Sequence, residues 1–361
     1  MKILVYDVAA EYGGAMTVLR DFYREVLEKS PRDIQWVFVV SQPVLEDTPQ
    51  VKILRFSKPK KSRLHRLAFE HLALPKILAA EKPDAVISLQ NMPVARYGGR
   101  QFVLLHQSLQ FCDRTVSFLK GEERSLAVQQ RIICRIYRRT LPKAEHVFVQ
   151  TRWMKEDTMR WLGWPEDKIS VVPSRVRPPR LGAYTGTGSR TFFYPAGADL
   201  YKNHDLVIAA CKLLAGEGIT DYRVIFTLPR EGDPDAERII RAARGLPIEF
   251  VGSLPHETVW EYYSGTVLLF PSYLETCGLP LVEARAAGAW ILASDLPFAR
   301  EVLEGYPNKA FFPYDGAEVL AQQMKAVLGG VPWQQPAPRT ARTEVGLMES
   351  MLNIIKGANA Q

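Results

Sequence analysis

The sequence predicts an α/β protein made of two domains, each with a doubly wound parallel sheet. Three observations lead to this fold class. The chain has 361 residues, which is long for one hydrophobic core but suits two domains of about 170 residues each. Apolar runs of strand length alternate with segments of helical periodicity, as in parallel sheets covered by helices. This alternation stops near residue 172 and then begins again.

The first domain is predicted to open with a strand, a glycine loop and a helix. Ile3–Asp7 is the strand, Gly13 and Gly14 belong to the loop, and apolar residues then recur at helical spacing as far as Leu27. Periodicity and composition predict further strands at 35–40, 51–56, 85–88, 102–105 and 146–150, and helices at 64–80 and 126–140.

A proline-rich stretch at 171–179, followed by glycine, serine and threonine at 182–189, marks the predicted break between the domains. Alternation then resumes with strands at 191–194, 223–227, 248–251 and 267–270 and helices at 205–215, 234–244 and 256–264. A proline-punctuated linker at 331–338 precedes an amphipathic helix at 345–355. We expect domains at 1–172 and 173–342, with the segment 343–361 returning to the first domain.

Composition predicts a soluble globular protein, since 47% of residues are hydrophobic and 24% are charged. No apolar run approaches the roughly 20 residues that span a bilayer. Met1 and Lys2 lead directly into a strand, so no secretory signal is expected and the predicted location is cytoplasmic. The four cysteines lack metal-site spacing and are expected to be reduced and mostly buried: Cys112, Cys134, Cys211 and Cys277.

Charge is distributed unevenly along the chain. Residues 1–180 carry 31 Lys and Arg against 19 Asp and Glu, a formal charge of +12, whereas the remainder carries 15 against 20, a charge of −5. A basic half suits nucleic acid, anionic lipid or a phosphorylated acceptor. Nucleic-acid binding is not predicted, because neither a recognisable module nor aromatic residues among the basic ones are evident.

Two basic segments carry interleaved apolar residues. The first is a cluster of basic residues around an apolar stripe, which suits an anionic membrane surface at the inner face of a cell membrane. The basic residues are Lys52, Arg55, Lys58, Lys60, Lys61, Arg63 and Arg66, and the stripe is Leu64, Leu67, Ala68, Phe69 and Leu72. The second segment, with Arg131, Arg135, Arg138 and Arg139, fits equally well a core-facing helix with a solvated basic side.

The segment 268–288 holds the strongest chemical signal. An apolar strand ends in a loop with Glu275, and Pro280 is predicted to be the first residue of a helix that carries Glu283 about one turn further on. The amides of residues 276–279 would lie at the helix N-terminus, where free N–H groups attract an anion such as a diphosphate. Carboxylates on both sides could accept hydrogen bonds from sugar hydroxyls.

This pattern resembles retaining glycosyltransferase family 4. The resemblance rests on two glutamates with seven residues between them, which include Gly278-Leu279-Pro280, followed by 288–297 and Arg300-Glu301-Val302, and it extends over nearly the whole chain. It implies the GT-B fold, with two facing Rossmann-like domains and a C-terminal helix that crosses back to the first. It also implies a nucleotide-sugar donor, a glycan or lipid-linked acceptor and no divalent metal.

The resemblance also implies roles for individual residues. Glu275 would contact the donor sugar, Glu283 the ribose, and the amides of Cys277, Gly278 and Leu279 the phosphate and sugar. Lys202 would meet the diphosphate, and the backbone of Gly252, Ser253 and Leu254 would hold the base. His106 would stand beside the donor sugar, and Gly13 and Gly14 near the diphosphate and acceptor.

Two positions depart from the family pattern. An aromatic residue is usual where Cys277 stands, and an arginine often follows the glycine at Gly197, where this chain has Ala198. Arg175 is a candidate to replace that charge. Asp233-Pro-Asp235 matches the Asp-x-Asp metal motif of another glycosyltransferase fold, but Pro234 and the acids after it predict a helix N-cap instead.

The expected function is retaining transfer of a hexose from a UDP- or GDP-sugar to a glycan or lipid-linked glycan, as in bacterial surface polysaccharide synthesis. The catalytic candidates are Glu275, Lys202 and His106. The alternative is a non-catalytic nucleotide-sugar-binding protein with the same fold.

Overall fold

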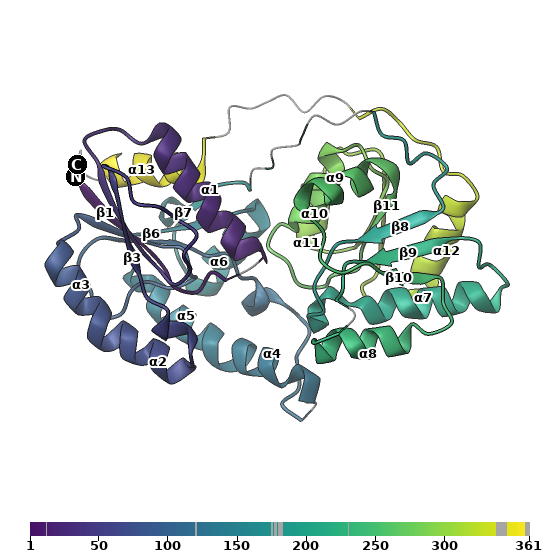
Figure 1. Ribbon diagram of the computed structural model, residues 1–361, viewed down its shortest axis with the longest axis horizontal. Coiled ribbons are helices and arrows are strands. Elements are labelled where there is room, and N and C mark those ends of the chain that lie inside the picture. Colours follow the sequence, from purple (N-terminus) through teal and green to yellow (C-terminus); the bar gives the residue numbers. More distant parts are fainter. Residues whose placement is uncertain are drawn as a thin grey trace. The chain divides into compact units, whose positions relative to one another are not determined.

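The computed structural model describes residues 1–11, 13–119, 121–174, 176, 179, 183–229, 231–336 and 345–357. The chain forms two compact units, each with its own sheet (Figure 1). The first comprises Met1–Phe118, Arg124–Pro173 and Ala341–Gln361, and the second comprises Leu119–Glu123 and Ser174–Thr340. The division at 172/173 stays a prediction, and the one at 342/343 lies outside the described residues.

The first unit has a seven-stranded parallel sheet in the order β3-β2-β1-β4-β5-β6-β7. The strands of this sheet are short, and the five between the two edge strands are almost entirely buried, which explains why those five read as apolar runs rather than as alternating patterns. Their bounds are β1 Lys2–Asp7, β2 Gln35–Val40, β3 Val51–Arg55, β4 Ala85–Ser88, β5 Gln101–Leu104, β6 His146–Val149 and β7 Ile169–Val171.

Helices accompany this sheet. Both predicted helical stretches, 64–80 and 126–140, are confirmed, and each contains a π-helical turn, at Phe69–Ala73 and Gln129–Ile133. The α-helical parts of the unit are α1 Gly13–Lys29, α2 Arg63–Ala68, α3 Leu74–Glu81, α4 Arg124–Val128, α5 Cys134–Thr140, α6 Arg152–Leu162 and α13 Leu347–Gly357.

The C-terminal helix α13 packs on α1 of the first unit, as predicted (Figure 1). Met348, Met351 and Ile355 join the core that contains Phe22 of α1. The buried side chain of Glu25 accepts a hydrogen bond from the backbone N–H of Met348 at 3.0 Å, which satisfies a free donor in the first turn of α13.

The second unit has a six-stranded parallel sheet in the order β10-β9-β8-β11-β12-β13. Its strands are β8 Thr191–Tyr194, β9 Arg223–Phe226, β10 Ile248–Phe250, β11 Val267–Phe270, β12 Ile291–Ser294 and β13 Lys309–Phe312. Its helices are α7 His204–Gly216, α8 Pro234–Ala242, α9 His256–Gly265, α10 Leu279–Ala286, α11 Pro297–Val302 and α12 Ala317–Leu328. The predicted α/β class is therefore confirmed.

Candidate functional site

The carboxyl ends of β8 and β11 mark the natural ligand position of the second unit. From β8 the chain proceeds to β9 on one side of the sheet and reaches β11 on the other, so the strand order reverses between these two neighbours. In doubly wound sheets, ligands bind outside the carboxyl ends of the strands at such a switch point. The loop after β8 carries Lys202, and the loop after β11 carries Glu275.

Lys202 and Glu275 meet at this position. The ammonium group of Lys202 lies 2.6 Å from Oε1 of Glu275, and the side chains are only 18% and 15% exposed. The hydroxyl of Ser272 donates to the same oxygen at 2.9 Å. A cation and a carboxylate with acceptor capacity to spare therefore stand together in a partly water-excluded place.

The loop that carries Lys202 is held from three directions. Asn203 adopts a left-handed backbone conformation with φ of 60°, and its side-chain amide donates to the carbonyls of Pro271 at 3.1 Å and Tyr314 at 2.7 Å. The buried hydroxyl of Tyr194 donates to the carbonyl of Lys202 at 2.8 Å. These bonds hold the lysine loop against the loop after β11.

The helix after β11 begins at Leu279, so Pro280 is its second residue and not its first as predicted. Gly278 is the N-cap in a left-handed conformation with φ of 63°. A Cβ atom there would lie 3.0 Å from Cζ of Phe270, so glycine meets both a conformational and a steric demand. The helix thus begins one residue closer in sequence to Glu275 than predicted.

The side chain of Cys277 lies in the interior of the second unit. Its thiol is buried and lies 3.4 Å from the hydroxyl of Ser174. Burial raises the pKa of the Cys277 thiol to about 11, so it stays protonated at neutral pH. All four cysteines are free, and three of them are buried.

Glu283 lies in the first turns of α10 with both oxygens engaged. The hydroxyl of Tyr263 donates to Oε2 at 2.9 Å, and Nε2 of His256 lies 2.9 Å from Oε1. Burial, together with the charge of Glu283, holds the pKa of Tyr263 well above its usual value, so this hydroxyl remains a donor.

The other predicted contacts of this unit lie at the same edge of its sheet. Gly197 follows β8, and Gly252 follows β10 with φ of 75°. The N–H of Gly252 donates to the carbonyl of Leu228 at 3.2 Å, and Ser253 and Leu254 lead from it into α9. Arg175, considered as a replacement for the arginine missing after Gly197, lies outside the described residues.

In the first unit, His106 follows β5 and its N–H donates to the side chain of Asn91, after β4, at 2.8 Å. Desolvation lowers the pKa of the His106 imidazole to about 4, so the ring is neutral at pH 7.

Gly13 and Gly14 form the first turn of α1 rather than a loop, which corrects the prediction. Gly13 has φ of 61°, a conformation that glycine adopts without strain.

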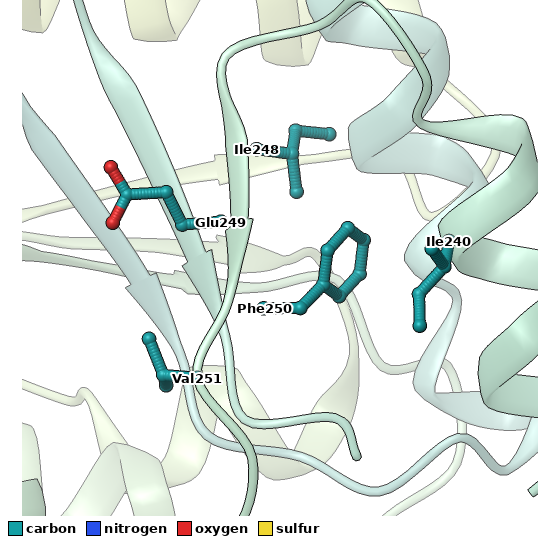
Figure 2. Close-up of a pocket in the computed structure, with 5 residues that line it drawn as sticks. All are labelled: Ile240, Ile248, Glu249, Phe250 and Val251. Atoms are coloured by element: carbon teal, nitrogen blue, oxygen red, sulfur yellow. The ribbon is translucent and has the colours of Figure 1, made fainter. Parts of the chain in front are cut away.

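A hollow of about 460 Å³ follows the edge strand β10. Ile248 and Phe250 point towards Ile240 of α8, while Glu249 and Val251 point the other way (Figure 2). Its lining offers no cation for a diphosphate, and none of the predicted donor-binding residues belongs to it. We therefore assign the candidate site to the Lys202–Glu275 pair.

Asp233 acts as the predicted cap. Its carboxylate accepts hydrogen bonds from the N–H groups of Asp235 at 3.0 Å and Ala236 at 3.2 Å, at the N-terminus of α8. Among the residues that the structure describes, no group of three or more His, Cys, Asp or Glu side chains is placed to hold a metal ion.

Three residues that contact the site carboxylates were missed by sequence reasoning: Ser272, Tyr263 and His256. Ser272 could have been noticed, because it precedes Glu275 by three residues. Tyr263 and His256 precede Glu283 by 20 and 27 residues, and no local pattern links them to it.

The two doubly wound units define a protein of the two-domain GT-B fold class. Residues 12–178 match the model of Glycosyltransferase Family 4, and residues 185–331 match that of Glycosyl transferases group 1. The chain belongs to glycosyltransferase family 4 and is a glycosyltransferase, which decides against a merely binding role. Membership implies a nucleotide-sugar donor and a glycan acceptor. None of the curated proteins matches the sequence.

Solved structures share the fold over the whole chain at low identity. A sucrose-phosphate synthase from Thermosynechococcus elongatus is 17% identical with a TM-score of 0.70, covering 99% of this chain and 97% of its own. WaaG, a glycosyltransferase involved in lipopolysaccharide biosynthesis, is 14% identical with a TM-score of 0.65, and coverage is 99% and 100%. The lipopolysaccharide outer core galactosyltransferase WaaB is 18% identical with a TM-score of 0.63 and the same coverage.

Proposed function

We propose that the second unit binds a UDP- or GDP-hexose at the carboxyl ends of β8 and β11, and that the enzyme transfers the hexose with retention of configuration. The observation that carries this proposal is the 2.6 Å pair of Lys202 and Glu275 at the switch point of the sheet. The donor has a diphosphate, which needs a cation, next to a sugar whose hydroxyls need an acceptor. This pair offers both.

The diphosphate, the ribose and the base of the donor each have a candidate partner in the second unit. The N–H groups of Cys277, Gly278 and Leu279, at the N-terminus of α10, suit the diphosphate and sugar. Glu283 suits the ribose hydroxyls, because an ionised carboxylate accepts hydrogen bonds and donates none. The backbone at Gly252–Leu254 suits the base without selecting uracil or guanine by a side chain.

In the proposed mechanism, the departing diphosphate takes the proton of the acceptor hydroxyl while the new bond forms on the same face of the sugar. Lys202 stabilises the negative charge that develops on the leaving group. Glu275 orients the sugar through its hydroxyls. His106, neutral at pH 7, is proposed to form a hydrogen bond with a sugar hydroxyl. No divalent metal takes part.

The acceptor is proposed to be a glycan, free or on a lipid carrier, at the inner face of a bacterial membrane. No helix in the described part of the chain is long and apolar enough to cross a bilayer. On α2 and the turn after it, Leu64 is 77%, Leu67 50% and Leu72 65% exposed, with Lys58 and Lys61 exposed nearby. We call these five residues the α2 surface and propose that it contacts anionic lipid.

The donor site is tested by titrating UDP and GDP, and by measuring turnover with a panel of nucleotide sugars. We expect Lys202→Ala to weaken binding of the matching diphosphate 10- to 100-fold, or about 1.4–2.8 kcal/mol, while nucleoside binding changes little. Glu275→Gln should lower kcat about 10²- to 10³-fold, as for other groups that act on the transition state.

The matched control is Lys212→Ala, which removes an exposed lysine from α7 of the same unit. It should bind and turn over like the wild type. Unchanged diphosphate affinity in Lys202→Ala, or unchanged kcat in folded Glu275→Gln, would contradict the proposed site.

A further inference from the structure

Glu283 is held by two different donors, one for each carboxylate oxygen. Tyr263 donates to Oε2 and His256 lies at Oε1, both at 2.9 Å. The Glu283 side chain is 12% exposed, whereas that of His256 is 68% exposed. The carboxylate is therefore clamped between a partner in the core and a partner at the surface.

The two partners differ in how firmly they are fixed. Tyr263 is 1% exposed and packs edge-to-face against Phe193 and Trp260. His256 is the first residue of α9, and its ring packs edge-on against Trp260 at 6.1 Å between ring centroids. It also follows the Gly252–Leu254 loop after a single residue, Pro255, the N-cap of α9. His256 thus connects the loop proposed to hold the base with the carboxylate proposed to hold the ribose.

The contact with Glu283 determines that Nε2 of the His256 imidazole carries a proton. An ionised carboxylate oxygen only accepts, so Nε2 must carry a proton for this hydrogen bond to form. The carboxylate has about four acceptor positions in total, so one donor on each oxygen leaves a free position on each. Two vicinal ribose hydroxyls need two such positions at a fixed separation and orientation.

We propose that His256 is a positioning residue for the ribose subsite. Together with Tyr263 it stops the carboxylate of Glu283 from rotating, so that both oxygens already face the ribose hydroxyls before the nucleotide arrives. This inference rests on the proposed role of Glu283 in ribose binding. His256 acts through Glu283 and needs no contact with the reacting atoms.

The experiment compares UDP and GDP with their 2′,3′-dideoxy counterparts, which lack both ribose hydroxyls. We expect the wild type to prefer the ribonucleotide of the matching base. His256→Ala should weaken the ribonucleotide about tenfold and leave the dideoxy nucleotide unchanged, so that the preference collapses. His256→Gln should restore most of it, because the glutamine amide can donate to Oε1 over a similar reach.

Two further variants separate the possible outcomes. Glu257→Ala alters the neighbouring exposed residue in the same turn of α9 and should bind both nucleotides like the wild type. Glu283→Gln should reduce the preference for the ribonucleotide. If that preference survives in Glu283→Gln, the ribose role of Glu283 is wrong, and the proposed function loses that contact.

If Glu283→Gln loses the preference but His256→Ala keeps it, the ribose subsite stands and the role of His256 is wrong. Equal weakening of both nucleotides in His256→Ala would show a general structural effect and would also overturn the inference. Tighter ribonucleotide binding in His256→Ala would show that the histidine competes with the ribose for Glu283.

Discussion

His204 directly follows the lysine loop and is buried without hydrogen bonds. It is 2% exposed, and neither ring nitrogen has a hydrogen-bond partner among the described residues. Its ring packs against those of Tyr194 and Phe226, at centroid distances of 5.0 and 4.8 Å. Burial, reinforced by the charges of Lys202 and Arg238, lowers the pKa of His204 to about 3. The ring is therefore neutral in the folded protein.

His204→Phe should reduce the acid sensitivity of the second unit. Between about pH 6.5 and pH 3 the unfolded chain protonates this histidine and the folded chain does not, so the free energy of unfolding falls as the pH falls. The slope from one such group is at most about 1.4 kcal/mol per pH unit. Urea unfolding at about pH 7 and pH 5 measures it for both proteins.

In the His204→Phe variant, the free energy of unfolding should fall less steeply as the pH falls, by at most about 1.4 kcal/mol per pH unit. The variant should also match or exceed the wild type in stability at pH 7, because phenylalanine fills the same space without unpaired polar atoms. An identical pH dependence in both proteins would show that His204 takes up a proton in the folded state.

At the scale of elements, the N-terminus of α10 depends on a glycine. Gly278→Ala should destabilise the second unit by about 1–3 kcal/mol and weaken diphosphate binding, because the left-handed N-cap is strained and the new Cβ would crowd Phe270. Thermal unfolding and UDP or GDP titration measure the two effects.

Gly305→Ala is the matched control for backbone strain. Gly305 has a similar φ of 68°, but a Cβ there would meet nothing within 4 Å. We expect a smaller loss of stability and normal nucleotide affinity. Equal losses in the two variants would mean that the contact with Phe270 plays no part.

The cap of α8 leads to a prediction about metals. Asp233 uses its carboxylate on the N–H groups of its own helix, and Lys202 and the α10 amides are proposed to meet the diphosphate. Turnover should therefore survive EDTA, and Asp233→Ala should lose about 1 kcal/mol of stability but keep its activity. Activity lost on chelation and restored by Mg²⁺ or Mn²⁺ would refute the metal-independent mechanism.

For the whole molecule, the exposure of each basic side chain shows which charges of the basic half can contact a partner. Lys60 of the predicted membrane segment is paired with Glu11 at 3.1 Å and donates to the carbonyl of Ala9, so its charge is partly engaged. Lys58 and Lys61 are exposed beside the leucines of the α2 surface. In the second basic segment, Cys134 and Tyr137 are buried and all four arginines are exposed, so this helix faces the core and turns its basic side to solvent; Ile132 and Ile136 are exposed as well.

Vesicles rich in anionic lipid should sediment the protein at low salt and release it at high salt. Each basic residue near the surface contributes about 1 kcal/mol, and salt screens this attraction over about 10 Å at 0.1 M. The combined change of Lys58 and Lys61 to Ser should weaken the binding, and adding Leu64→Ser and Leu72→Ser should weaken it further.

Replacing Lys212 and Lys356 by Ser removes the same charge from exposed positions outside the α2 surface and should have little effect. Donor affinity should be unchanged in every one of these variants. Equal sedimentation with neutral and anionic vesicles, or none with either, would instead favour a dissolved acidic acceptor.

The sequence by itself determined the alternation of strands and helices. Strands such as β1 and β11 are buried along nearly their whole length, so apolar runs identify them locally. Within the motif 275–283, the order of residues was enough to predict a loop carboxylate, a helix N-terminus and a second carboxylate. The start of α10 was misplaced by one residue, because the N-cap is Gly278 in a left-handed conformation, which the order of residues does not reveal.

Tertiary structure alone decided which distant side chains meet. Lys202 and Glu275 are 73 residues apart in sequence, and they pair because β8 and β11 are neighbours in the sheet. The clamp of Tyr263 and His256 on Glu283 arises from the packing of α9 against α10. Local periodicity reports which face of an element is buried, but not which element covers it, so contacts between elements had to come from the fold.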